Sequence, residues 1–432
     1  MYYLFTVLFL LVSSRANFLS YIEPLIYIFT GIYLVAGIQL NRFKQSDIRF
    51  FAKFTLIYFA FITLRAVFLT HLSPYFYFYD VSFYLKRILF VFVYCAVLKE
   101  TAVPLIVKVT IHGAMISIFF YICQLIDGNA VFALGAFINL PPRVGNPDYT
   151  NFFIFTFDSG HAIRNCGFVW EPGAYGCFTV MALLMHFMLN KFKFDIGAIF
   201  LVLAIITTLS TTAYIGLLFA FLLYYRVHGG KLGPFLLFAV PIITFIAIEV
   251  PFLFDKIGKT YDVDQHNLES IDDLTIYYER SGEGQIHLNR FASATILYNI
   301  YGYKLLWGIS NGYQGSDKVL KNVNISNGDV DFLAKFGVIG YVFFFYRYGL
   351  LFKSFLHKNE YVLYCILVFL VLSFGEPMPI FHCSLSFLFL YHYTTPELLG
   401  MNEKEEDEED EEEEVEDEEQ IKPSGVALGN SH

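Results

Sequence analysis

Two arginines and a glutamate are the residues of this chain best suited to chemistry. Arg164 and Glu171 lie in the segment RNCGFVWEPG, directly before a long apolar run, and Arg290 lies in HLNRFASATILYNIYGYKLLWG. Charged groups at a membrane edge are costly and are usually functional, so Arg164 and Glu171 are candidates for a charge pair that lines a wet cavity. A guanidinium binds phosphate oxygens through paired hydrogen bonds, so Arg290 is a candidate anion clamp.

Each of these residues also has a structural interpretation. Glu171 precedes Pro172, and a carboxylate followed by proline is typical of a capped helix start. Arg290 has apolar neighbours, as an arginine would have in an interfacial helix from which its side chain snorkels to water.

A third polar segment, NGDVDFLAKFGVIG, leads into another apolar run. Asn327 and Asp329 are candidate substrate-binding residues, although Asp329 could be only a favourable charge at a helix N-terminus. Gly337 and Gly340 follow, and small residues at this spacing allow two helices to approach closely.

Weaker candidates are scattered through the remaining polar segments. Arg143 and His161 lie between two apolar runs, and both are candidate substrate-binding residues. Glu249 and Glu376 lie near the ends of apolar runs.

These residues must be positioned by membrane helices, because the chain is too apolar for a water-soluble fold. Hydrophobic residues make up 56% of the 432 residues and charged residues only 16%, against about 25% charged in soluble domains. The apolar residues form long runs, which in lipid satisfy their backbone groups internally as helices. The sequence therefore predicts an all-α, polytopic transmembrane helix bundle.

Hydropathy predicts about twelve spans of roughly 14–25 residues. The stretch 194–226 is too long for one crossing, and we split it at Ser210. The predicted limits are 2–14, 22–40, 50–70, 83–98, 102–126, 166–190, 194–209, 212–226, 233–251, 330–350, 361–374 and 378–394.

The placement of lysine and arginine predicts that both termini are cytoplasmic. The pair Lys86 and Arg87 is an exception, because it lies near the outer end of its span. Arg65 and Arg347 fall inside predicted spans, so either their side chains snorkel to water or the predicted limits of these spans are wrong.

Two long segments, 127–165 and 252–329, then lie on the outer side, and a transmembrane domain covers residues 1–400. Long ordered loops are often functional. Residues 401–432 hold 15 acidic residues, and without them the chain has 24 acidic and 27 basic residues. Such a block of like charge predicts a disordered cytoplasmic tail.

Several function classes lack their signatures. Nucleotide-binding glycine motifs, HExxH and GxSxG are absent, so chemistry driven by cytoplasmic nucleotide is unsupported. The six cysteines are scattered and form no CxxC pair, so neither a zinc site nor a disulfide framework is supported. No other metal-ligand cluster stands out, and we predict no metal site, no cofactor and no nucleic-acid partner.

Five features in a fixed order carry a resemblance to a known superfamily. They are Arg164-x-x-Gly167-Phe168-x-x-Glu171-Pro172-Gly173, the break at Leu209-Ser210-Thr211-Thr212, Arg290, the turn Leu306-Trp307-Gly308, and Phe336-Gly337-Val338-Ile339-Gly340. This pattern, over residues 160–345, resembles the O-antigen polymerase and O-antigen ligase-like membrane proteins.

The resemblance implies a metal-independent glycosyltransferase with a fold of the GT-C type. Its donor would be an oligosaccharide on a polyprenyl pyrophosphate at the outer leaflet of a bacterial cytoplasmic membrane. Arg164 and Arg290 would then bind the pyrophosphate, and Glu171 would be the base, with Asp329 or His287 as alternatives. A flippase or a chain-length regulator would be a possible partner.

Within the superfamily the sequence favours a polymerase over a ligase. The similar ligases carry a histidine before the Gly-x-x-Gly helix, where this chain has Ser326-Asn327-Gly328-Asp329. A flippase for the same lipid-linked sugars is a second hypothesis, although no internal repeat is visible. A non-catalytic assembly protein that uses the acidic tail is a third.

Overall fold

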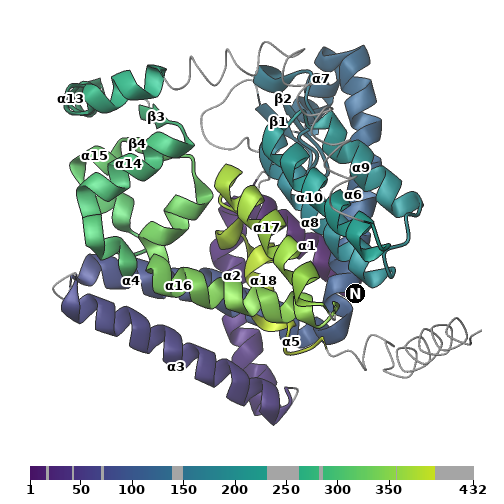
Figure 1. The fold of residues 1–432 in the computed structure, drawn as a ribbon, viewed down its shortest axis with the longest axis horizontal. Coiled ribbons are helices and arrows are strands. Elements are labelled where there is room, and N and C mark those ends of the chain that lie inside the picture. Colours follow the sequence, from purple (N-terminus) through teal and green to yellow (C-terminus); the bar gives the residue numbers. More distant parts are fainter. Residues whose placement is uncertain are drawn as a thin grey trace, which may run out of the picture.

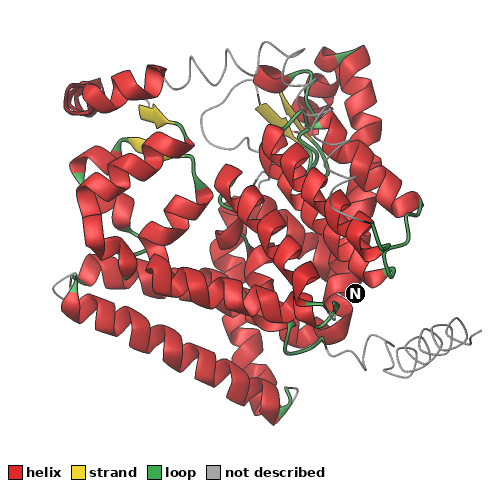
Figure 2. Ribbon diagram, in the orientation of Figure 1, coloured by secondary structure: helices red, strands yellow, loops and turns green. Residues whose placement is uncertain are grey.

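The computed structural model describes residues 1–15, 19–40, 43–69, 73–138, 149–230, 262–281, 286–356 and 358–394. This part of the chain is mostly helical, which agrees with the predicted class (Figure 1). Figure 2 also shows short strands beside the helices. The α-helices are α1 (Tyr2–Ser14), α2 (Leu19–Gln39), α3 (Gln45–Phe68), α4 (Pro74–Phe83), α5 (Leu89–Leu98), α6 (Ala102–Ile126), α7 (Gly128–Ile138), α8 (Pro172–Leu189), α9 (Ile196–Thr207), α10 (Thr211–Val227), α13 (Ile271–Ser281), α14 (Arg290–Tyr301), α15 (Lys318–Lys321), α16 (Gly328–Lys353), α17 (Asn359–Gly375) and α18 (His382–Leu390).

Helices occupy the predicted spans, apart from 233–251, which lies outside the described residues. Within the described part, three helical segments are long and apolar enough to cross a membrane: Gln45–Phe68, Pro74–Ile126 and Pro172–Leu189. Shorter apolar helices of 10–17 residues, including α1, α9, α10 and α17, accompany them. The helices are therefore compatible with a membrane protein.

The three long segments differ in how much of their surface the protein covers. In the most apolar 18-residue stretch of α8, 89% is buried inside the protein, whereas in that of α3 only 28% is buried. Helix α8 packs against α6, α9, α10 and α17, at the centre of the main hydrophobic core. Helix α3 leaves apolar side chains such as Leu56 and Leu64 exposed, as expected for a helix that faces lipid.

The predicted break in the stretch 194–226 is confirmed. Helix α9 ends at Thr207 and α10 begins at Thr211, with Leu209 in the left-handed region at φ 47°. The Ser210 hydroxyl caps α10 by accepting a hydrogen bond from the Ala213 amide at 3.4 Å.

The two long segments that the sequence predicts to lie on the outer side, here called the outer segments, are folded rather than simple loops. The first contains α7 and an antiparallel hairpin of β1 (Tyr149–Asn151) and β2 (Thr156–Asp158). The second contains α13, α14 and α15, with β3 (Ile286–Leu288) parallel to β4 (Val323–Ile325). The second segment has its own hydrophobic core, which includes Leu297, Tyr313 and Leu320.

The second outer segment is locked to α16 through two glycines. Gly308 has φ +72° and Gly337 has φ +68°, which interrupts α16. A Cβ on Gly337 would lie 2.3 Å from the Trp307 carbonyl carbon, and one on Gly308 would lie 2.4 Å from the Gly337 nitrogen. We expected Gly337 to allow two helices to approach; in the structure it contacts a turn.

The expectation that Arg65 snorkels to water is wrong. Arg65 is buried in an ion pair with Asp80 of α4, and it also donates to the Lys335 carbonyl oxygen at 2.5 Å. Asp80 accepts further hydrogen bonds from Ser310 and Asn311, so it joins α4 to the turn that follows Gly308. The charge is therefore compensated by protein and does not need water.

Arg347 is only partly buried and lies against aromatic rings. Its guanidinium lies 4.8 Å from the centre of the Tyr391 ring and 5.0 Å from that of Phe343. Such cation–π contacts replace part of the lost hydration. The acidic tail, 401–432, lies outside the described residues.

Candidate active site

Glu171 lies at the N-terminal end of α8, but its side chain does not cap the helix. It has extended backbone angles, Pro172 occupies the first turn as predicted, and the Glu171 side chain makes no capping hydrogen bond. Its carboxyl instead shares a hydrogen bond with the carboxyl of Glu376. Glu171 therefore occupies the N-cap position of α8, as the structural interpretation predicted, but its side chain makes no capping hydrogen bond.

Glu376 follows the last residue of α17 and is only 6% exposed. Burial and the neighbouring Glu171 carboxyl raise the pKa of Glu376 well above its usual value, while Arg290 and Arg164 act in the opposite direction. Two carboxyl groups that share a hydrogen bond hold one proton between them. The pair therefore resembles an acid–base dyad, in which two carboxyl groups share one proton.

Gly173 makes this approach of the two carboxyl groups possible. A Cβ at this position would lie 2.5 Å from Glu376 Oε1 and 3.8 Å from the Ser210 hydroxyl. A side chain on residue 173 would therefore displace the Glu376 carboxyl. Ser210 is the N-cap residue of α10, so the ends of α8, α10 and α17 meet at this point.

The two arginines approach the carboxyl pair from separate elements. Arg164 Nε donates to the Thr208 carbonyl oxygen at 2.9 Å, beside the break between α9 and α10. Arg290 begins α14 and donates to the Gly375 carbonyl oxygen at 3.2 Å, one residue before Glu376. Both side chains are half-buried and act electrostatically on Glu376. The structure thus places Arg164 and Arg290 within electrostatic range of Glu376, the partner of Glu171.

Asn327 holds Arg290 in place. Its side-chain oxygen accepts from the Asp329 and Val330 amides and so caps α16, and its Nδ2 donates to the Arg290 carbonyl oxygen at 3.0 Å. The side-chain amide of Asn327 therefore holds the backbone of Arg290 and of the first turn of α16 in place. The adjacent Gly328 packs against the backbone of Glu376, since a Cβ there would lie 2.1 Å from the Glu376 carbonyl oxygen.

The other predicted site residues have local partners or are not described. Asp329 accepts a hydrogen bond from the Tyr341 hydroxyl at 3.0 Å, within α16. His161 Nδ1 lies 2.9 Å from an Asp158 carboxylate oxygen in its own loop. Arg143 and the side chain of His287 lie outside what the structure describes.

Glu376 is the residue that sequence reasoning undervalued. It appeared only as one of two carboxylates near the ends of spans, and the other, Glu249, lies outside the described residues. One signal was present: Glu376-Pro377 repeats the dipeptide Glu171-Pro172 at a span end. The repeat places two carboxyl groups at helix ends on the same predicted side of the membrane.

Two cations and two carboxyl groups with one shared proton suit a reaction that moves a proton while an anion leaves. Among the described residues, no group of three or more His, Cys, Asp and Glu side chains is placed to hold a metal ion. No protein-family model, curated protein or solved structure matches this chain.

Proposed function

We propose that this chain is a membrane glycosyltransferase that polymerises polyprenyl-pyrophosphate-linked oligosaccharide units into a surface polysaccharide. The observation that carries the proposal is the meeting of Arg164, Arg290, Glu171 and Glu376 at the ends of four helices. The proposal also includes about twelve spans in a fold of the GT-C type, with the site on the outer face of a bacterial cytoplasmic membrane and both termini in the cytoplasm.

In the proposed reaction a sugar hydroxyl of one lipid-linked unit attacks the anomeric carbon of the other. The new carbon–oxygen bond forms as the bond between that carbon and the pyrophosphate oxygen breaks. Glu171 accepts the hydroxyl proton, and the pyrophosphate leaves with the bonding electron pair. Arg164 and Arg290 stabilise the charge that develops on it.

Glu376 has a positioning role in this scheme. Burial and the Glu171 carboxyl raise the pKa of Glu376, so Glu376 carries the shared proton and donates it in a hydrogen bond to Glu171. This bond fixes the orientation of the base. The buried position of Glu376 keeps it from competing for the substrate hydroxyl.

The arginines give the direct test. We expect Arg164→Ala and Arg290→Ala to abolish the long-chain polysaccharide ladder on a gel when each variant complements a deletion strain. Arg226→Ala is the matched control, because Arg226 lies in an exposed ion pair with Glu360 in a different part of the fold. Long chains at normal levels from the Arg164 and Arg290 variants would overturn the proposal.

The same strain separates this proposal from its alternatives. A flippase predicts that its deletion leaves lipid-linked units on the inner leaflet, whereas a polymerase predicts single units on the outer face. A ligase predicts that polymer still forms but remains on the polyprenyl lipid. A docking role for the tail predicts that deletion of 401–432 abolishes function, and we expect that it does not.

A further inference from the structure

The end of α14 and the turn that follows it expose a row of large apolar side chains. At Gly302, where φ is +51°, the chain turns into a short 3₁₀ helix, η4 (Gly302–Leu306). The large exposed side chains of this stretch are called the aromatic patch, and they are between 45% and 75% exposed: Tyr298, Tyr303, Leu306 and Trp307. Large apolar residues that are exposed together mark a surface that contacts a membrane or another molecule.

Local geometry turns the patch away from the core of the second outer segment. A 3₁₀ helix has about three residues per turn, so side chains three positions apart lie one above the other. Tyr303 and Leu306 have this spacing and are both exposed, whereas Leu305 packs against the core of the segment. Trp307 follows directly, and its amide donates to the Lys304 carbonyl oxygen at 3.1 Å. The core and the patch therefore lie on different sides of η4.

The aromatic patch continues onto the exposed face of α16. The backbone of Trp307 lies against Gly337, since a Cβ on Gly337 would lie 2.3 Å from the Trp307 carbonyl carbon. Directly after Gly337, α16 exposes Val338, Val342 and Tyr346, which are four residues apart and so share one face of the helix. An exposed apolar helix face therefore begins where the patch ends.

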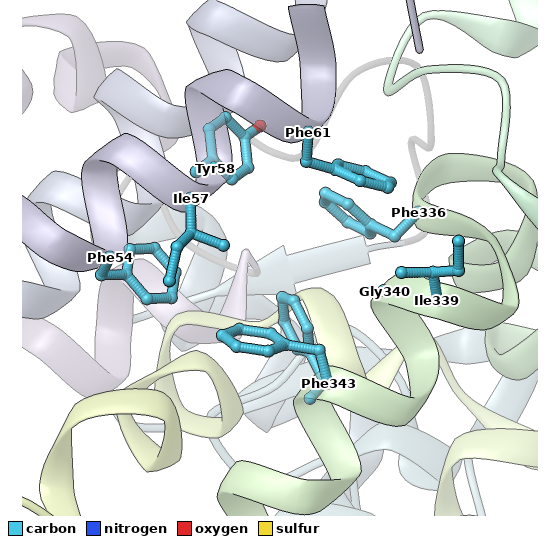
Figure 3. A pocket seen from close by; sticks show the side chains of 9 residues that line it. Phe54, Ile57, Tyr58, Phe61, Phe336, Ile339, Gly340 and Phe343 are labelled. Atoms are coloured by element: carbon cyan, nitrogen blue, oxygen red, sulfur yellow. The ribbon is translucent and has the colours of Figure 1, made fainter. Parts of the chain in front are cut away.

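This part of α16 borders a groove that offers no polar partner. The groove lies between α3 and α16 and has a volume of about 110 Å³. Figure 3 shows Tyr58 and Phe61 of α3 and Phe336 and Ile339 of α16 around this space. Of the residues that line it, only Tyr58 has a polar side-chain atom, and that hydroxyl donates to the Asp80 carbonyl oxygen at 2.9 Å. An apolar groove beside exposed apolar helix faces suits lipid chains and not water.

The aromatic patch lies at the depth expected for a membrane surface. The stretch from Gly337 to Lys353, the last residue of α16, is about 24 Å long, and the hydrocarbon layer of a bilayer is about 30 Å thick. The charge pattern of the spans predicts that Lys353 lies at the cytoplasmic boundary, so Gly337 and the adjoining Trp307 lie near the outer one. Tryptophan and tyrosine gather at this level, where their rings meet lipid and their polar atoms meet water. Lys304, next to Tyr303, has a long stem that carries its charge to the head groups.

We propose that the aromatic patch docks on the head-group region of the bilayer, so that the second outer segment rests on the outer surface of the membrane. Trp307 and the two tyrosines lie among the head groups, and α16 enters the hydrocarbon layer beside them from Val338 onward. A glycan would also stack on aromatic rings, but the patch continues into Leu306 and Val338, which offer no partner to sugar hydroxyls. The inference requires that α3 and α16 cross a membrane, and it does not use the proposed enzyme activity.

The fluorescence of Trp307 tests the depth of the patch. The chain has two tryptophans, so Trp170→Phe leaves Trp307 as the only one. We reconstitute this full-length variant in nanodiscs of phosphatidylcholine that carries bromine either near the head-group end of its chains or near their methyl end. We expect the shallow bromines to quench most of the Trp307 emission and the deep bromines to quench little of it.

A tryptophan lower on α16 gives the depth scale. In a tryptophan-free chain, made by Trp170→Phe with Trp307→Phe, Val342→Trp places the fluorophore on the exposed face of α16, about 7 Å beyond Gly337. We expect the deep bromines to quench this variant more strongly than they quench Trp307. Equal quenching by the deep bromines would place the patch inside the hydrocarbon layer and would overturn docking at the surface.

Two further positions test whether the patch itself is the docking face. In the tryptophan-free chain, Tyr303→Trp should be quenched by the shallow bromines as Trp307 is. Ile276→Trp is the matched control, because Ile276 is an exposed apolar residue of α13, which packs on α15 and β3 on the side of the segment away from α16 (Figure 1). We expect aqueous iodide and neither lipid to quench the Ile276→Trp variant. Shallow quenching of Ile276→Trp as strong as that of Tyr303→Trp would contradict docking through the patch.

A patch that faces water gives a different result. Quenching of Trp307 by aqueous iodide, with no effect of either brominated lipid, would overturn the proposal and would leave a glycan or another protein as the partner of these rings. None of these measurements depends on polymer formation, so the inference and the proposed function stand or fall separately.

Discussion

Exchange of the two glutamates for glutamine should give different results, although their carboxyl groups share one hydrogen bond. Glutamine at position 376 retains a donor to Glu171, as the protonated carboxyl does, so Glu376→Gln should keep polymerisation within about tenfold of wild type. Glu171→Gln removes the base and should lower the rate by about 10²–10⁴-fold. Glu376→Ala removes the donor and should be much less active than Glu376→Gln.

The stability of these variants follows from the raised pKa of Glu376. Between its usual pKa of 4.5 and the raised value, the folded protein holds a proton that the unfolded chain has lost. Wild type therefore loses stability as the pH rises through this range, by about 1.4 kcal/mol per pH unit. Glu376→Gln has no such group, so its stability relative to wild type should increase with pH by that slope.

Two measurements check this prediction. Thermal unfolding of the detergent-solubilised proteins from pH 5 to about pH 8 gives the difference in stability between Glu376→Gln and wild type. The polysaccharide ladder of complemented deletion strains gives their activity. A stability difference that does not change with pH would refute the buried proton. An inactive Glu376→Gln beside an active Glu171→Gln would show that the roles of the two residues are reversed.

Three further predictions concern the residues that shape the site and its supports. Gly173→Ala should displace the Glu376 carboxyl and reduce polymer at least tenfold with unchanged expression, and normal polymer would contradict the close approach. Arg65→Ala should lower stability by about 3–5 kcal/mol by leaving Asp80 buried and unpaired, as measured by thermal unfolding, and Asp80→Asn in the same chain should recover part of that loss. Gly337→Ala combines a positive φ with a backbone clash and should greatly reduce the yield of folded protein on size-exclusion chromatography. Gly349→Ala should behave as wild type, because a Cβ there would make only ordinary contacts, with Ile366 Cδ1 at 3.6 Å and Val362 Cγ1 at 4.0 Å.

Much of the fold was predictable because membrane helices are encoded by local composition. The long apolar runs gave the helices within a few residues, and Ser210 marked the break between α9 and α10. The three-residue strands of the outer segments were not predictable, because such short strands carry no periodic pattern. Their pairing depends on residues that are distant in the sequence, as for β3 with β4.

The candidate site was predictable in part for a related reason. Arg164, Glu171 and Arg290 were found because charged residues at span ends are rare and conspicuous. The partner of Glu171 was not identified, because it depends on how α8 and α17 pack against each other. Likewise, Lys86 and Arg87 violated the charge pattern of the spans, but only the folded chain shows that they share a cavity with Arg15 and Lys335.

In the polymerase proposed above, the contact between Gly308 and Gly337 would limit how a growing glycan leaves the protein. Since neither residue has a side chain that could rotate aside, the turn and α16 meet backbone to backbone, and only a movement of the backbone could separate them. An exit that required the outer segment to swing away from α16 would break this contact and the hydrogen bond from Ile309 to Ala334. The proposed polymerase would therefore release its polymer with this junction closed, and any hinge would lie elsewhere in the chain.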